Sequence, residues 1–126
     1  MLSEADFIAP APMHWTRLAA RSFNQAAWLA QALSAASGKP WRPGALRRVK
    51  RRKSQAGLSS SERRRNVAGA IKASGKLTGQ TVLVVDDVLT TGATLEACAR
   101  ALRKAGASQV HAVTLARVVR STDILI

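Results

Sequence analysis

Residues 82–95 read VLVVDDVLTTGATL, and this stretch decides how the rest of the chain is understood. It opens with an apolar run, continues with two adjacent carboxylates, Asp86 and Asp87, and ends in a turn of hydroxyl residues around Gly92. The nearly unbroken β-branched run at 81–85 predicts a strand covered on both faces. In an open parallel sheet, ligands bind beyond the carboxyl ends of the strands. We therefore expect the acidic pair to stand at a strand end, next to a ligand site.

The elements that follow this stretch predict an α/β fold. Apolar spacing predicts a helix over residues 93–105, ended by Gly106, and another strand over residues 110–115. A strand, a helix and a strand in close succession form a βαβ unit with parallel strands and a right-handed crossover. The expected architecture is a small open parallel sheet flanked by helices.

The N-terminal half adds a strand, a helix and a basic loop to this plan. Residues 7–9 read as a short strand that Pro10 ends, and residues 22–37 read as a helix. Residues 44–60 are basic and then rich in Gly and Ser, which predicts a mobile loop or ribbon. Residues 1–126 are expected to form a single domain.

The charge of the chain points to a polyanionic partner. The sequence has 20 Lys and Arg against 7 acidic residues, a net charge of +13. Residues 42–65 hold ten of these basic side chains and only one acid, Glu62. Such a segment attracts nucleic acid or a small ligand with several phosphates, and charge alone does not separate the two.

Composition also limits the class of protein. The single cysteine, Cys98, can form neither an internal disulfide nor a multi-cysteine zinc site, which favours a reducing, cytoplasmic setting. No apolar run approaches the ~18 residues of a membrane span, so no transmembrane segment is predicted. The N-terminus lacks the basic and apolar regions of a signal peptide.

The turn after the acidic pair has the chemistry of a phosphate site. The first N–H groups of the helix that begins near residues 91–94 have no helical partners, and the helix dipole favours an anion. Gly92 allows close approach of the backbone, and Thr90, Thr91 and Thr94 add hydroxyl donors. The neighbouring carboxylates would repel a phosphate unless they bind another part of the same ligand. A vicinal diol offers two donors to such acceptors, so the stretch predicts a site for a ribose 5-phosphate.

Other interpretations of the turn fit less well. It has neither the Gly-Lys-Ser/Thr ending of a P-loop nor the GxGxxG of a dinucleotide turn. Direct Mg²⁺ binding by both carboxylates is disfavoured because neighbouring residues of a strand point apart. The plain structural alternative is that Asp87 only caps the helix, but a cap needs one Asp rather than two.

The sequence also resembles a known family. VLVVDDVLTTGAT (82–94) resembles the phosphoribosyl pyrophosphate (PRPP) signature of type I phosphoribosyltransferases. Together with residues 10–30, 51–71 and 85–117, it is similar to the ComF-like (competence protein F) proteins, and the resemblance covers nearly the whole chain. Longer members begin with a cysteine-rich, zinc-binding segment that residues 1–126 lack.

The resemblance implies a role for particular residues. Asp86 and Asp87 hold the ribose hydroxyls and are the candidate catalytic carboxylates, and no protein metal ligand is assigned. The implied 5-phosphate site consists of Thr90, Thr91, Gly92, Ala93 and Thr94. The implied pyrophosphate-binding cations are Arg17 and Arg21, and the implied flexible loop that closes over the site carries Arg52, Gln55 and Arg64.

The implied function is PRPP binding together with Mg²⁺, with phosphoribosyl transfer to a nitrogenous base as the candidate reaction. Whether transfer occurs stays open, because some relatives of this fold bind PRPP only as a signal. The alternative is a single-stranded DNA-binding component of competence and DNA uptake that uses residues 42–65 and contacts other competence proteins. In that case Trp41 is the expected base-stacking residue and Trp28 an expected core residue. The resemblance is also compatible with a homo-oligomer.

Overall fold

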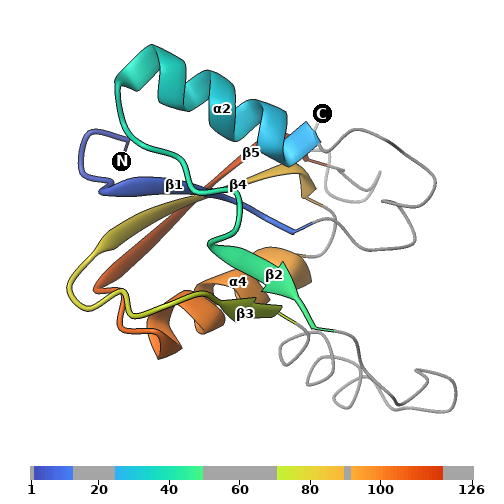
Figure 1. The fold of residues 1–126 in the computed structure, drawn as a ribbon. Coiled ribbons are helices and arrows are strands. Elements are labelled where there is room, and N and C mark those ends of the chain that lie inside the picture. The colour runs from blue at the N-terminus through green and yellow to red at the C-terminus, as the bar shows by residue number, and fades with distance from the viewer. Residues whose placement is uncertain (1, 13–24, 50–70, 90–91, 118–126) are drawn as a thin grey trace, which may run out of the picture.

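The computed structural model describes residues 2–12, 25–49, 71–89 and 92–117, and in it a parallel sheet lies between two layers (Figure 1). The sheet contains β1 (Phe7–Pro10), β4 (Thr81–Leu89) and β5 (Gln109–Arg117), in the spatial order β1-β4-β5. Helix α2 (Gln25–Ser37) covers one face, and helix α4 (Ala93–Lys104) covers the other. The predicted open parallel sheet flanked by helices is confirmed.

Strand β4 is the centre of the fold because it is buried on both faces. Val82 and Val84 pack in one apolar cluster with Cys98 and Leu102 of α4. Leu83 points to the opposite face and packs in a second cluster that includes Ala30 of α2. This alternation is what a strand with two covered faces produces, and it confirms the interpretation of the β-branched run.

The β4–α4–β5 segment forms the predicted βαβ unit. The two strands pair in parallel from Thr81 opposite Gln109 to Leu89 opposite Arg117. Helix α4 returns across the sheet, and Gly106 follows its end at φ +110, where an added Cβ would lie 3.1 Å from the Thr78 backbone. This close approach requires glycine, and it fixes the end of α4 beside the turn that leads into β4.

Helix α2 lies on the sheet through small side chains. Ala26 and Ala30 are its buried residues. Trp28 falls two residues from each of them, on the outward side of the helix, and is 54% exposed. The expectation that Trp28 belongs to the core is therefore wrong, because two residues along a helix turn a side chain about 200° away.

Strand β1 extends one residue further than predicted and includes Pro10. The backbone N–H of Ala11 donates to Val85 O (2.8 Å), whereas that of Ile8 donates to Pro40 O (2.9 Å) on the other side of the strand. By this alternation the nitrogen of Pro10 faces away from β4, so the ladder does not need an N–H there. Proline is compatible with an edge position, which is why it does not end the strand.

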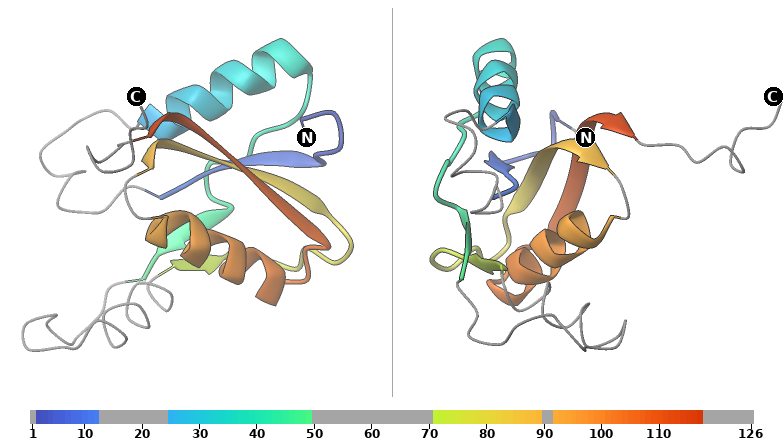
Figure 2. Two further views of the ribbon diagram at one scale, coloured as in Figure 1. Left: turned by 180° about the vertical axis from the view of Figure 1, so that it is seen from behind. Right: turned by 90° about the vertical axis from the view of Figure 1, so that its right-hand side faces the viewer.

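A short antiparallel ribbon accompanies α4 on its side of the sheet, as both views in Figure 2 show. It consists of β2 (Leu46–Arg48) and β3 (Ile71–Ala73). Leu46 and Ile71 are buried in the same cluster as the α4 side chains. The predicted loop or ribbon thus begins as a ribbon, while most of residues 44–60 lie outside the described ranges.

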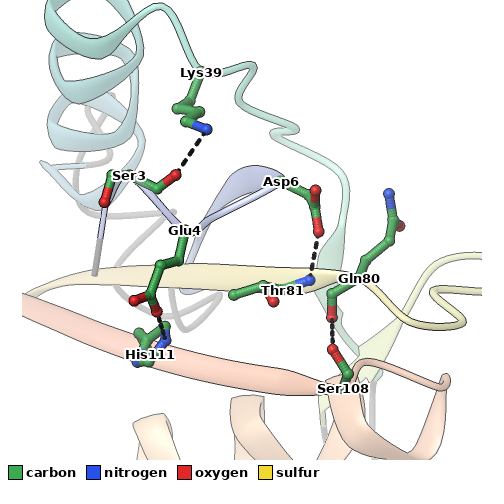
Figure 3. Close-up of polar contacts among 8 residues, drawn as sticks. All are labelled: Ser3, Glu4, Asp6, Lys39, Gln80, Thr81, Ser108 and His111. Atoms are coloured by element: carbon green, nitrogen blue, oxygen red, sulfur yellow. Dashed lines mark hydrogen bonds and ion pairs between the residues drawn. The ribbon is translucent and has the colours of Figure 1, made fainter.

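Polar contacts fix the amino ends of the strands, away from the acidic pair (Figure 3). Asp6 Oδ2 accepts a hydrogen bond from the Thr81 backbone N–H (2.7 Å), and the Ser108 hydroxyl donates to Gln80 O (3.3 Å). His111 Nε2 lies 3.5 Å from Glu4 Oε2. Neither of the described helices has the length and apolar character to cross a membrane.

Candidate functional site

The acidic pair lies near the carboxyl ends of the strands, but inside β4 rather than at its end. Residues Val82 to Val85 are buried, and exposure rises to half-buried at Asp86 and Asp87. The strand then continues to Leu89, because pairing with β5 continues to Arg117. The prediction that the pair marks the strand end is wrong by two residues, and the ladder therefore holds the backbone of Asp86 opposite Thr114.

The Asp86 carboxylate bends back onto its own strand. Its Oδ1 accepts a hydrogen bond from the Asp87 backbone N–H at 2.8 Å. The pKa of Asp86 is raised from 3.8 to about 6, chiefly by burial and then by the adjacent Asp87 carboxyl, while the Asp87 N–H and the Arg48 charge act to lower it. A carboxyl with this pKa changes its charge close to physiological pH.

Arg48 is a site residue that sequence reasoning did not single out. It is the last residue of β2, and its Nε donates to Pro12 O at 3.1 Å. Its charge also acts on both Asp86 and Cys98. The signal was present in the sequence as strand alternation, since Leu46 is buried, Arg47 exposed and Arg48 half-buried.

The turn after β4 leads into α4 through a glycine. Gly92 is the N-cap of α4 with φ 81° and ψ −2°, a conformation that side chains rarely adopt. As a glycine, Gly92 itself provides no side-chain cap for this helix. Gly92, and not Asp87, is therefore the residue at the cap position, and Asp87 belongs to β4.

The only acid in the first turn of α4 is held in an ion pair along the helix. Glu96 pairs with Arg100 one turn later, at 2.9 Å, and both side chains are well exposed. The predicted phosphate-binding residues Gly92, Ala93 and Thr94 are brought together at the start of α4. The rest of that turn, Thr90 and Thr91, lies outside the described residues.

Other predicted site residues also fall outside the described part of the chain. These are the pyrophosphate cations Arg17 and Arg21 and the loop residues Arg52, Gln55 and Arg64. Their roles stay predictions.

Cys98 lies on α4 beneath the acidic pair. It is fully buried, and its burial, with the nearby Asp86 carboxylate as a further cause, raises the pKa of its thiol to about 12. A thiol with this pKa is neutral at physiological pH and a poor nucleophile. Among the described residues, no three His, Cys, Asp or Glu side chains gather closely enough to hold a metal ion.

The ribbon carries exposed positive charge beside this site. Arg47 stands directly opposite Lys72 in the β2–β3 register, and both are exposed. Arg42, in contrast, places its guanidinium 4.2 Å from the centroid of the Phe7 ring. Trp41, the expected base-stacking residue, is half-buried and packs on the cluster beneath α2, and its stacking role stays a prediction.

Comparison with known proteins places this arrangement among phosphoribosyltransferases. The model of the phosphoribosyl transferase domain matches residues 18–123. The purine phosphoribosyltransferase of Pyrococcus horikoshii shares the fold with a TM-score of 0.58 at 21% identity, over 94% of this chain and 68% of that structure. The glutamine PRPP amidotransferase of B. subtilis gives a TM-score of 0.59 at 26% identity, over 89% of this chain and 22% of its own.

Curated relatives carry names that point to DNA. Competence protein F of Haemophilus influenzae is 36% identical over 113 residues, which is 87% of this chain and 49% of the relative. The DNA utilization protein YhgH of Escherichia coli K12 is 33% identical over 114 residues, 90% of this chain and 50% of the relative. The chain thus spans about half the length of the curated relatives it matches.

Proposed function

The chain belongs to the phosphoribosyl transferase domain family and is ComF-like within it, and from this premise we propose that it binds PRPP where β4 leads into α4. The observation that carries the proposal is the half-buried acidic pair of β4, five residues before a helix that starts at a glycine. The two carboxylates can accept hydrogen bonds from hydroxyl groups, and the start of α4 can bind an anion. Both then lie within the span of one sugar phosphate.

The carboxylates supply the ribose end of this site. An ionised carboxylate can only accept hydrogen bonds, and each of the two ribose hydroxyls has one O–H to donate to it. Asp86 spends one lone pair on the Asp87 N–H, which fixes its orientation before a ligand arrives. A carboxylate oriented in advance loses less side-chain entropy on binding.

The start of α4 supplies the phosphate end. The glycine cap presents backbone rather than side chain to the ligand, and the helix dipole places partial positive charge there. Glu96, which would oppose an anion, is paired with Arg100. Thr90 and Thr91 complete this turn in the proposal.

The pyrophosphate end is assigned to the basic segments. We propose Arg17 and Arg21 as its cations, with Arg52, Gln55 and Arg64 on the loop that closes over it. Mg²⁺ keeps several waters and favours phosphate oxygens, so it is expected to arrive on the pyrophosphate, where it would neutralise the leaving group.

Phosphoribosyl transfer itself is the finer part of the proposal. The C1–O bond to pyrophosphate breaks, a bond from C1 to the acceptor nitrogen forms, and the proton of that nitrogen goes to a base. A carboxylate also stabilises the positive charge that develops on the sugar. Asp86 suits the base role because its raised pKa lies near the working pH.

The test is calorimetric titration of PRPP with Mg²⁺ into the wild type and into the Asp86→Asn/Asp87→Asn double variant. The wild type is expected to bind in the micromolar range, and the double variant at least about 100-fold more weakly, because hydrogen bonds to charged groups contribute about 1.5–3 kcal/mol each. Glu96→Gln removes an acid that pairs only at the surface and should bind normally. A folded double variant with wild-type affinity would overturn the proposal.

A second candidate function is binding of single-stranded DNA along the β2–β3 ribbon. Arg47 and Lys72 face the same side of the ribbon, directly opposite each other. Like charges in this position destabilise an antiparallel pair, so their presence favours an anionic partner. The names of the curated relatives, competence protein F and DNA utilization protein, agree with this candidate.

A further inference from the structure

Arg48 contacts parts of the chain that are far apart in the sequence. It lies at the end of β2, and its Nε donates a hydrogen bond to Pro12 O (3.1 Å), 36 residues earlier. Pro12 lies two residues after the end of β1, at the start of the segment to which the proposed pyrophosphate cations belong. The ribbon is thereby tied to the carboxyl end of β1.

The same side chain also acts on groups of β4 and α4. Its charge acts on the Asp86 carboxylate of β4 and on the Cys98 thiol of α4. The side of β4 that carries Val82 and Val84 also packs against α4 and the ribbon, and Asp86 continues this side. Arg48 therefore lies where β2, β4 and α4 converge.

We propose that Arg48 is a positioning residue of the ribose-phosphate site, which holds the Asp86 carboxylate and the chain after β1 in the arrangement that binds the ligand. This inference rests on the proposed PRPP function. The inference assigns Arg48 a positioning role, whereas its sequence neighbour Arg47 contributes exposed positive charge.

The groups around Asp86 explain why a cation is needed there. Burial and the Asp87 carboxyl both favour the protonated form, while Cys98 is neutral and contributes no positive charge. Among the groups that act on Asp86, the Asp87 N–H and Arg48 favour the ionised form. Without Arg48, the pKa of Asp86 should move further upward. As the pH falls, Asp86 would then be protonated at a higher pH and would cease to be an ionised acceptor for the ribose hydroxyl.

Three variants separate the roles of Arg48. Arg48→Gln removes the charge and keeps a donor, and Arg48→Lys keeps the charge and removes the planar Nε–H that bonds Pro12 O. Arg103→Gln is the matched control, because it removes the same charge from the exposed last turn of α4. Thermal denaturation establishes that each variant is folded.

The first readout needs no ligand. NMR titration of the Asp86 carboxyl carbon should show a midpoint raised by at least about half a unit in Arg48→Gln, as expected for loss of a nearby opposite charge. Arg48→Lys and Arg103→Gln should titrate like the wild type. An unchanged Asp86 midpoint in folded Arg48→Gln would overturn the inference.

The second readout is PRPP affinity as a function of pH. Arg48→Gln should bind about tenfold more weakly near pH 7, and its affinity should fall at a higher pH than that of the wild type. The phosphate of the ligand also titrates near pH 6, but equally with every variant, so the difference between variants reports on the protein. In Arg48→Lys, the pH midpoint of PRPP affinity should stay that of the wild type. Its binding should be weaker, because the contact with Pro12 is lost.

The two readouts distinguish the two proposals. If the wild type binds no PRPP, the proposed function fails, and the carboxyl titration still decides whether Arg48 governs Asp86. If the wild type binds PRPP and folded Arg48→Gln binds equally well with the same pH midpoint, the inference fails and the proposed function stands. If Arg48→Gln does not fold, wild-type affinity in Arg48→Lys overturns the inference, and weaker binding at the wild-type midpoint supports it.

Discussion

The β4–α4 junction and the β2–β3 ribbon use charge in opposite ways. At the junction, Asp86 and Asp87 are half-buried, and the Asp86 carboxylate is oriented by a backbone N–H. On the ribbon, Arg47 and Lys72 are exposed and lie opposite each other, with like charge. In the proposed function, the junction recognises one small ligand of fixed shape, whereas the ribbon would attract anions of any shape.

Both regions give up stability for this purpose. A half-buried carboxylate whose pKa is raised costs free energy when it is ionised, and like charges across an antiparallel pair repel. The junction depends on backbone geometry and the ribbon on charge alone. Substitutions that change the backbone of the junction should therefore affect different properties from substitutions that remove charge from the ribbon.

The largest effect is expected from the backbone of the junction. Gly92→Ala forces a Cβ onto a residue at φ +81 and should lower the free energy of unfolding by about 1–2 kcal/mol. Gly75→Ala, at φ +79 in the turn after β3, is a matched control with the same strain. Urea denaturation should show similar losses, but only Gly92→Ala should also weaken PRPP binding. Equal PRPP affinity in both variants would show that Gly92 has no part in PRPP binding.

A smaller effect is expected when the ribbon loses its charge. Arg47→Gln/Lys72→Gln should weaken single-stranded DNA binding about tenfold at low salt and reduce the log–log salt slope by about 1.4, which is ~0.7 for each of two phosphate contacts. Arg103→Gln/Lys104→Gln, on the last turn of α4, removes the same charge elsewhere. Fluorescence anisotropy over a salt series measures both quantities. If the two double variants weaken binding equally, the ribbon has no special part in it.

The smallest effect concerns stability and pH. Folding raises the pKa of Asp86 from 3.8 to about 6, so its ionisation destabilises the fold fully above pH 6 and not at all below about pH 4. Asp86→Asn keeps an oxygen for the Asp87 N–H and removes this cost. Its Tm should exceed that of the wild type by a few degrees at pH 7.5 and match it at pH 4, provided no ligand is present. A lower Tm at pH 7.5 would contradict the raised pKa.

Much of the fold could be predicted because local patterns and packing agree. The β-branched run became the central strand, and the βαβ unit formed as its spacing indicated. The errors occurred where a tertiary neighbour decides. Pro10 stays in a strand because its nitrogen faces an edge, and β4 passes Asp86 because β5 continues beside it.

The residues of the candidate site that are contiguous in the sequence could be predicted, but the residues that pack around them could not. The acidic pair and Gly92 are adjacent in sequence, so their chemistry could be interpreted directly. Arg48 acts on Asp86 from 38 positions earlier in the chain, and only the packing of the ribbon on α4 reveals it. Trp28 was assigned to the core because it lies in a helix, whereas the buried positions of α2, Ala26 and Ala30, place it on the outward side.

The central claim is that the acidic pair of β4 binds the ribose hydroxyls, and the most direct measurement compares ribose 5-phosphate with 2-deoxyribose 5-phosphate on two proteins. Calorimetry of both ligands with the wild type and with Asp86→Asn/Asp87→Asn gives the coupling between the ligand hydroxyl and the carboxylates. The wild type should prefer ribose 5-phosphate by about tenfold or more, and the double variant should show almost no preference. A preference of the same size in both proteins, or none in the wild type, would contradict the claim.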